Sequence, residues 1–172
     1  MMKHALIIIA PENFRDEELF VPQKILEEAG ITTTIASREA GTCRGKLGGT
    51  AKAVIGLNQI NVEDFDAVIF VGGPGSSIYF DDPAAHLITQ KAVAANKVLA
   101  AICAAPSILA QAGVLKNRKA TVFPDSSYEE ILTKNEAILT RENLESDGKI
   151  ITANDAPMAE EFGEKIVGLL GK

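Results

Sequence analysis

The stretch KVLAAICAAPSILAQAG, residues 97–113, decides the fold of this chain. Residues 97–103 form a short apolar run that ends at Cys103, which is typical of a buried strand. Residues 104–113 follow with helical character, and Gly113 is expected to close that helix. A buried strand that turns directly into a helix indicates a parallel α/β sheet, and small residues such as Ala104 permit so tight a turn.

Strand and helix signals alternate along the rest of the chain. Strands are predicted where short runs are apolar or β-branched, at residues 4–10, 31–37, 66–75 (a strand that runs into a glycine turn), 97–103, 119–123, 137–140 and 148–153. Helices are predicted at residues 15–30, 81–96 and 104–113, at a short segment near 126–130, and from near Pro157. The glycine-rich residues 41–57 are expected to form a small hairpin or an irregular excursion.

Local chemistry predicts how several helices begin, end and pack. Pro22 is expected to bend or loosen the first turns of helix 15–30. The residues expected at helix ends are Gly30 and Gly113 at C-termini and, at N-termini, Asp82 with Pro83 and a capping box of Ser126 with Glu129 or of Ser127 with Glu130. The residues expected on apolar helix faces are Ala84, Leu87, Ile88, Ala92 and Ala95 in helix 81–96, and Phe162, Ile166, Leu169 and Leu170 in the last helix.

Composition limits the classes of function. Of 172 residues, 47% are hydrophobic, so a single domain spanning residues 1–172 with a full core is expected. The formal net charge is −6 and no stretch concentrates Lys and Arg, which argues against a large nucleic-acid footprint. No window approaches the roughly 18 apolar residues of a membrane-spanning helix, and the N-terminal apolar run is too short for a signal peptide. We therefore expect a cytoplasmic protein that binds neither nucleic acid nor membrane, with Cys43 and Cys103 unpaired.

Alternating strands and helices predict a doubly wound sheet with helices on both faces, in which ligands bind beyond the carboxyl ends of the strands. That rule directs attention to residues 10–18, 71–77 and 103–107. At the third place, the unpaired N–H groups of a helix N-terminus are expected to lower the pKa of the Cys103 thiol. The alternative is that Cys103 is a buried thiol that acts as a small hydrophobe.

The glycine turn and the acidic segment each allow two interpretations. The turn lacks the spacing of a nucleotide-binding loop, so it is either a plain turn or it presents the N–H of Gly73 as an oxyanion donor. Asp16, Glu17 and Glu18 are either solvated partners of the helix dipole, or one of them reaches the thiol. In the second case, desolvation and the neighbouring thiolate would raise the pKa of that carboxyl.

Other candidate residues are weaker. His4 precedes the first strand, at the wrong end of the sheet, and His86 is expected on the solvent side of its helix, so a Cys–His dyad has no evident base. Neither C-x-x-C nor H-x-x-x-H spacing occurs, and we expect no metal site and no cofactor. Cys43 is expected to be a loop or strand thiol rather than a catalytic one.

Several of these segments together resemble the ThiJ/PfpI superfamily, also called the DJ-one superfamily. The segments that carry the resemblance are AICAAPSILAQAGVL (101–115), VIFVGGPG (68–75), DEELFVP (16–22) and ESDGKIITANDAP (145–157). The resemblance covers nearly the whole chain and is closer to the deglycase branch than to the His-containing protease branch. It implies a flavodoxin-like fold and usually a homodimer. It also implies that Cys103 is the nucleophile, that Glu18 is its partner carboxyl, and that the backbone N–H groups of Gly73 and Ala104 are the oxyanion donors.

The chain departs from the family pattern at three places. Protease-like members carry His directly after the nucleophile, where this chain has Ala104, and some deglycase-like members carry His where this chain has Phe123. Some members have Arg where Glu27 and Glu28 stand here, which argues against an anionic ligand contact at that place. The missing His counts most against a peptidase, because peptide hydrolysis needs a proton donor for the leaving amine.

The resemblance leaves several functions open. The first is a cofactor-free glyoxalase or deglycase, in which Cys103 adds to a 2-oxoaldehyde such as methylglyoxal or glyoxal, or acts on its adducts, and Glu18 moves the proton between the two carbons. The second is an oxidative-stress sensor or chaperone that works through oxidation of Cys103, with a protonated Glu18 hydrogen-bonded to the sulfinate. An intracellular cysteine peptidase is disfavoured, and a structural dimer with an inert thiol is the remaining alternative.

Overall fold

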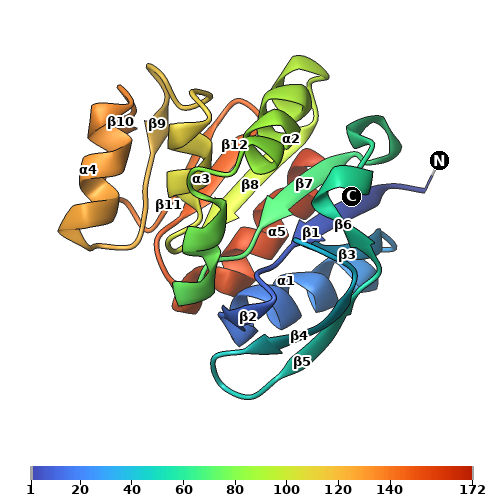
Figure 1. Cartoon of the computed structure of the whole chain (residues 1–172). Coiled ribbons are helices and arrows are strands. Elements are labelled where there is room, and N and C mark those ends of the chain that lie inside the picture. Colours follow the sequence, from blue (N-terminus) through green and yellow to red (C-terminus); the bar gives the residue numbers. More distant parts are fainter. Residues whose placement is uncertain (1, 172) are drawn as a thin grey trace.

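The computed structural model describes residues 2–171, which fold around a central sheet (Figure 1). In spatial order its strands are β11 (Leu144–Asp147), β12 (Ile150–Ala153), β8 (Val98–Ile102), β7 (Ala67–Phe70), β1 (His4–Ile8), β3 (Thr32–Ser37) and β6 (Ile55–Gly56). All neighbours run parallel except β11, which lies antiparallel to β12 at one edge. The predicted mostly parallel sheet is therefore confirmed.

Helices cover both faces of this sheet, because its strands are apolar on both sides. The helices are α1 (Asp16–Glu28), α2 (Pro83–Ala94), α3 (Pro106–Gln111), α4 (Ser126–Lys134) and α5 (Ala159–Leu169). In β1, Leu6 joins the core that includes residues of α2 and α3, whereas Ile7 joins the core that includes residues of α1 and α5. The period-two alternation of strand side chains thus builds two cores from one sheet.

Shorter elements surround the sheet. A second sheet joins β2 (Glu12–Phe14) to the antiparallel hairpin of β4 (Gly41–Gly45) and β5 (Thr50–Ala53), and a third pairs β9 (Lys119–Ala120) with β10 (Ile138–Leu139). The short 3-10 helices are η1 (Leu57–Gln59), η2 (Val62–Asp64), η3 (Pro74–Tyr79) and η4 (Ala156–Met158). Of the two structures expected for residues 41–57, the hairpin is the one that forms. The strands predicted at 119–123 and 137–140 are only two residues long each and lie outside the central sheet.

Several local predictions meet the structure with mixed outcomes. Asp82 caps α2, as predicted, because its side chain accepts hydrogen bonds from the N–H groups of Ala84 and Ala85. Leu87 was predicted on the buried face of α2, but it is 50% exposed. The buried face of this helix is centred on Ile88, which was predicted there too, and Leu87 lies beside that face. Asp125, not a serine, caps α4. Helix α1 runs unbroken through Pro22, whose side chain is buried.

One consequence of the parallel pairing matters for function. The carboxyl ends of β1, β7, β8 and β12 meet at one edge of the sheet. Among the described residues, no helix is both long enough and apolar enough to cross a membrane.

Candidate active site

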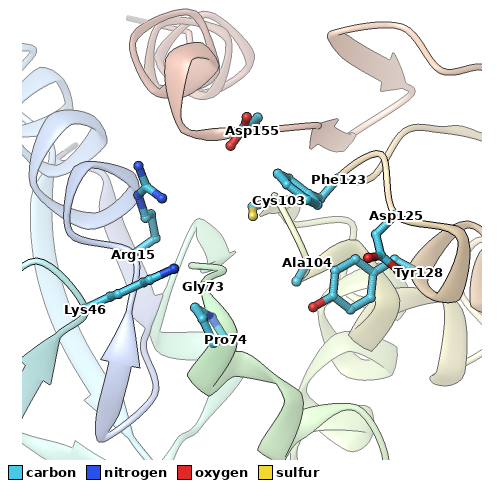
Figure 2. Close-up of a pocket in the computed structure, with 10 residues that line it drawn as sticks. All are labelled: Arg15, Lys46, Gly73, Pro74, Cys103, Ala104, Phe123, Asp125, Tyr128 and Asp155. Carbon is cyan, nitrogen blue, oxygen red and sulfur yellow. The ribbon is translucent and has the colours of Figure 1, made fainter.

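Cys103 directly follows the last residue of β8, at a sharp bend before α3. Its φ is +64°, in the left-handed region that side chains with a β-carbon seldom adopt. Its N–H donates to the carbonyl of Ala153 at 2.9 Å, and its carbonyl accepts from the N–H of Phe123 at 2.8 Å. These two hydrogen bonds hold the unusual conformation, and the half-buried thiol faces a cavity (Figure 2).

Glu18 lies in the first turn of α1, and its side chain is completely buried. Its Oε1 accepts a hydrogen bond of 2.9 Å from the N–H of Gly72, in the glycine turn after β7. Its Oε2 is buried and has no hydrogen-bond partner. A carboxylate oxygen of Glu18 and the Sγ of Cys103 lie within 4.8 Å of each other. Two strand ends and a helix start therefore bring together the predicted thiol and the predicted carboxyl.

Burial changes the acidity of both groups. Burial raises the pKa of Glu18 from 4.5 to about 8, although the hydrogen bond from Gly72 opposes this. Burial, followed by the negative charge of Glu18, raises the pKa of the Cys103 thiol to about 12, against smaller opposing effects of the Gly73 and Ala104 N–H groups. The prediction of a raised carboxyl pKa is confirmed, whereas the prediction of a lowered thiol pKa is wrong.

This outcome has a physical reason. The sequence shows that a helix begins near Cys103, but it does not show how much water the thiol loses or that a buried carboxylate lies beside it. The two groups cannot both ionise easily, so they behave as a pair that retains one proton over a wide range of pH.

The turn after β7 requires glycine, because its backbone lies very close to the side chains of Glu18 and Cys103. A β-carbon on Gly72 would lie 2.8 Å from both Oε1 of Glu18 and Cβ of Cys103. Gly73 has a φ of +96°, and its N–H lies close enough to the Cys103 sulfur to oppose the rise in the pKa of the thiol. The sequence left this turn between two interpretations, and the geometry favours the one in which Gly73 donates into the site.

The acidic residues at the start of α1 have different surroundings. Glu17 stays at the surface, 2.6 Å from the guanidinium of Arg15. Asp16 is buried and accepts hydrogen bonds from the N–H groups of Leu47 at 2.8 Å and Gly49 at 2.7 Å. The solvated-face interpretation is therefore wrong for Asp16 and Glu18, because the β4–β5 hairpin and the glycine turn fold over this end of the helix.

A cavity of about 180 Å³ opens above the thiol. The residues that line it are Arg15, Lys46, Gly73, Pro74, Cys103, Ala104, Phe123, Asp125, Tyr128 and Asp155. Figure 2 shows the thiol between a basic side, with Arg15 and Lys46, and a side that carries Phe123 and Tyr128. Glu18 is not among the residues that line the cavity.

Asp155 is the residue of this site that sequence reasoning missed. It lies two residues after β12, in the wall of the cavity (Figure 2). Its carboxylate, that of Glu18 and the Sγ of Cys103 all lie within 4.8 Å of one another, so these three residues could also hold a metal ion. The sequence did hold a signal for Asp155, because this residue follows the carboxyl end of a predicted strand. The rule that ligands bind beyond such strand ends identified the other three places and applies here too.

The remaining candidates lie elsewhere. His4 begins β1 and contacts Thr34 at 2.6 Å, and His86 in α2 contacts the carbonyl of Phe80 at 2.6 Å. Neither lines the cavity. Cys43 lies in β4, is 1% exposed and packs in a hydrophobic core, in agreement with a strand thiol. Both cysteines are free.

The fold and the site together define a class of protein: a doubly wound α/β domain with a thiol at the strand-to-helix turn and a buried carboxyl beside it. The chain belongs to the DJ-1/PfpI family, whose model matches residues 3–169. The fold is flavodoxin-like, as in that family.

Individual relatives agree with this assignment. An uncharacterised protein of Methanocaldococcus jannaschii is 37% identical over 99% of this chain and 85% of its own length. A protein of Pyrococcus horikoshii named a deglycase is 36% identical over 69% of this chain and 72% of its own length. The crystal structure of a ThiJ/PfpI domain protein from Brachyspira murdochii superposes with a TM-score of 0.95 at 32% identity, covering 99% of this chain and 97% of that one.

Proposed function

We propose that this chain is a cofactor-free enzyme that converts small 2-oxoaldehydes, or removes their adducts, through Cys103. The observation that carries the proposal is the arrangement of three parts around one sulfur: a buried carboxyl, two backbone N–H donors and a small cavity. The deglycase name of the Pyrococcus relative supports this class of activity, as does the name of a Caenorhabditis elegans relative, a glutathione-independent glyoxalase that is 25% identical over 98% of this chain.

The chemistry begins with removal of the thiol proton. Because the pKa of Glu18 is raised to about 8, its carboxyl both accepts and releases a proton near neutral pH, as a general base and acid should. As sulfur bonds to the aldehyde carbon, Glu18 takes the thiol proton, so no free thiolate is needed beforehand. The N–H groups of Gly73 and Ala104 then stabilise the negative charge that develops on the aldehyde oxygen.

The remaining steps are an internal redox reaction. In the thiohemiacetal, hydrogen moves from the former aldehyde carbon to the neighbouring carbonyl carbon, so the first carbon is oxidised and the second reduced. The product is an α-hydroxy thioester on Cys103. Water attacks its carbonyl carbon, the C–S bond breaks, sulfur regains a proton and a hydroxy acid leaves. The overall change adds one water molecule and requires no external oxidant or reductant.

Methylglyoxal is the substrate with which to test this proposal. Loss of methylglyoxal and appearance of lactate are followed by proton NMR for wild type, Cys103→Ala and the matched control Cys43→Ala. We expect wild type and Cys43→Ala to form lactate and Cys103→Ala to lose it. Lactate formation by Cys103→Ala at the wild-type rate, or by wild type no faster than by buffer, would overturn the proposal.

One observation favours a second role as an oxidation sensor. A carboxyl whose pKa is about 8, with an unpartnered Oε2 beside the sulfur, holds a proton that it can donate to a sulfinate. Intact-mass analysis after mild peroxide should then show the addition of two oxygen atoms to Cys103 in wild type, and over-oxidation to three in Glu18→Gln. Absence of the two-oxygen species in wild type counts against this role.

The homodimer that the family resemblance implies is checked by light scattering after size exclusion.

A further inference from the structure

The proposed reaction needs one group that Cys103 and Glu18 do not supply, namely a base in reach of the substrate carbons. The proposed reaction moves a hydrogen between two carbons of the substrate, and those carbons lie in the cavity, beyond the sulfur. Glu18 is completely buried and does not line the cavity. Its Oε1 accepts a hydrogen bond from Gly72, and one of its oxygens lies within 4.8 Å of the Cys103 sulfur. The carbon-to-carbon transfer that the sequence assigned to Glu18 therefore needs a group on the cavity wall.

The groups on that wall are few. Arg15 and Lys46 are cations, which are poor bases. Tyr128 keeps its proton, because burial raises the pKa of its phenol. The Asp125 carboxylate caps α4 through its Oδ1, and it does not belong to the group of acidic and thiol side chains that lie within 4.8 Å of one another at the Cys103 sulfur. Asp155 is the carboxylate that lies both in the wall and near the sulfur.

Asp155 is held in place by its own turn. Its Oδ1 accepts a hydrogen bond of 2.7 Å from the N–H of Ala156, which fixes the side chain at the start of η4. Within residues 2–171, no other side-chain hydrogen bond engages this carboxylate, so its second oxygen is available to a ligand. A carbon bonded to the Cys103 sulfur would lie between that sulfur and a carboxylate less than 4.8 Å away. This separation suits proton transfer from that carbon or from its neighbour.

We infer that Asp155 is a further catalytic residue of the proposed reaction: it removes the hydrogen of the thiohemiacetal carbon as a proton and returns a proton to the adjacent carbon. The electron pair of the broken C–H bond forms the double bond of an enediol, and the returned proton converts the enediol to the α-hydroxy thioester. Glu18 then exchanges protons with sulfur alone. This division also accounts for the missing histidine, because a carboxylate from β12 supplies the second proton-transfer group.

This inference rests on the proposed function, and its test must separate the two. The substitution Asp155→Asn keeps an oxygen that accepts from Ala156 and removes the base. Asp82→Asn is the matched control, because Asp82 caps α2 outside the cavity and Asn also caps helices. For each variant, three quantities are measured: kcat for lactate formation from methylglyoxal between pH 5 and 9, formation of the Cys103 adduct by intact mass, and the effect of added formate on kcat.

We expect Asp155→Asn to lower kcat at least about 10²-fold, the ordinary loss for a missing general base. The adduct with one methylglyoxal should still form and should accumulate, because the first step needs only the thiol and Glu18. Added formate should restore part of kcat in Asp155→Asn and leave wild type and Asp82→Asn unchanged, a rescue that a purely structural role does not produce.

The possible failures are distinct. If wild type and Asp82→Asn turn over and Cys103→Ala does not, but Asp155→Asn stays within about threefold of wild type, the inference on Asp155 is wrong and the proposed function stands. A lowered kcat without adduct accumulation or formate rescue also overturns it, since Asp155 would then only shape the site. The titratable and charged groups that face Asp155 and the thiol are Glu18 from α1, Arg15 at the start of α1, Lys46 from the hairpin, and Asp125 and Tyr128 from the α4 side. If wild type forms no lactate, the proposed function fails and this inference falls with it.

Discussion

The buried carboxyl of Glu18 should make this protein less stable as the pH rises, and Glu18→Gln should remove that dependence. The folded state keeps a proton on Glu18 up to about pH 8, whereas the unfolded chain loses it near 4.5. Between these values the folded state binds more protons, so its stability falls as the pH increases. At about 1.36 kcal/mol per pH unit, the whole effect is on the order of 4–5 kcal/mol, as an upper limit.

The assay is urea unfolding of wild type and Glu18→Gln at a series of pH values from 5 to 9. Gln keeps the shape and the oxygen that accepts from Gly72, so the variant should fold. Relative to Glu18→Gln, wild type should lose several kcal/mol of unfolding free energy across the series. Glu17→Gln, on the same helix but at the surface, should follow wild type. Parallel curves for wild type and Glu18→Gln would refute the burial argument.

Other substitutions test how the site and fold are held. Gly72→Ala should lose activity and destabilise the fold by on the order of 1–3 kcal/mol, because the added β-carbon would lie 2.5 Å from the Ile102 carbonyl oxygen. Gly168→Ala, where the β-carbon would meet no other atom, should leave stability unchanged or raise it slightly. Equal midpoints of urea unfolding for these two variants would contradict this account. Asp82→Ala should lower the unfolding free energy by about 1 kcal/mol through loss of the α2 cap, and Asp82→Asn should not. Leu87→Gln should change it by less than about 0.5 kcal/mol in thermal unfolding, since the side chain is half exposed.

The sequence was sufficient for the sheet and for the places where chemistry gathers. Short continuous apolar runs that alternate with helices indicate a parallel sheet, and parallel strands bring their carboxyl ends together. That rule alone pointed to Cys103 and to the glycine turn. Helix geometry allowed either Glu17 or Glu18 to reach the thiol, and the family resemblance, which includes the spacing to Pro22, implied Glu18. The structure agrees, since Glu18 is buried beside the sulfur and Glu17 is paired at the surface.

What the sequence could not supply depends on contacts between distant segments. The pKa of Cys103 is set by burial and by a carboxylate 85 positions earlier in the chain, neither of which is visible near the elbow. Lys46 reaches the cavity because Asp16 binds the tip of the β4–β5 hairpin. Asp155 follows a strand whose place beside β8 is fixed only by the fold, so its closeness to sulfur could not be calculated from spacing.

The most direct test of the central claim, that Cys103 and Glu18 titrate as a coupled pair, is the pH dependence of Cys103 alkylation. Iodoacetamide rates are measured from pH 5 to 10 in a Cys43→Ser background, with and without Glu18→Gln. Coupled titration predicts a step in the rate near pH 8, where Glu18 ionises, and the disappearance of that step in Glu18→Gln. The same single midpoint in both proteins would show that the thiol titrates independently of Glu18, and would contradict the account.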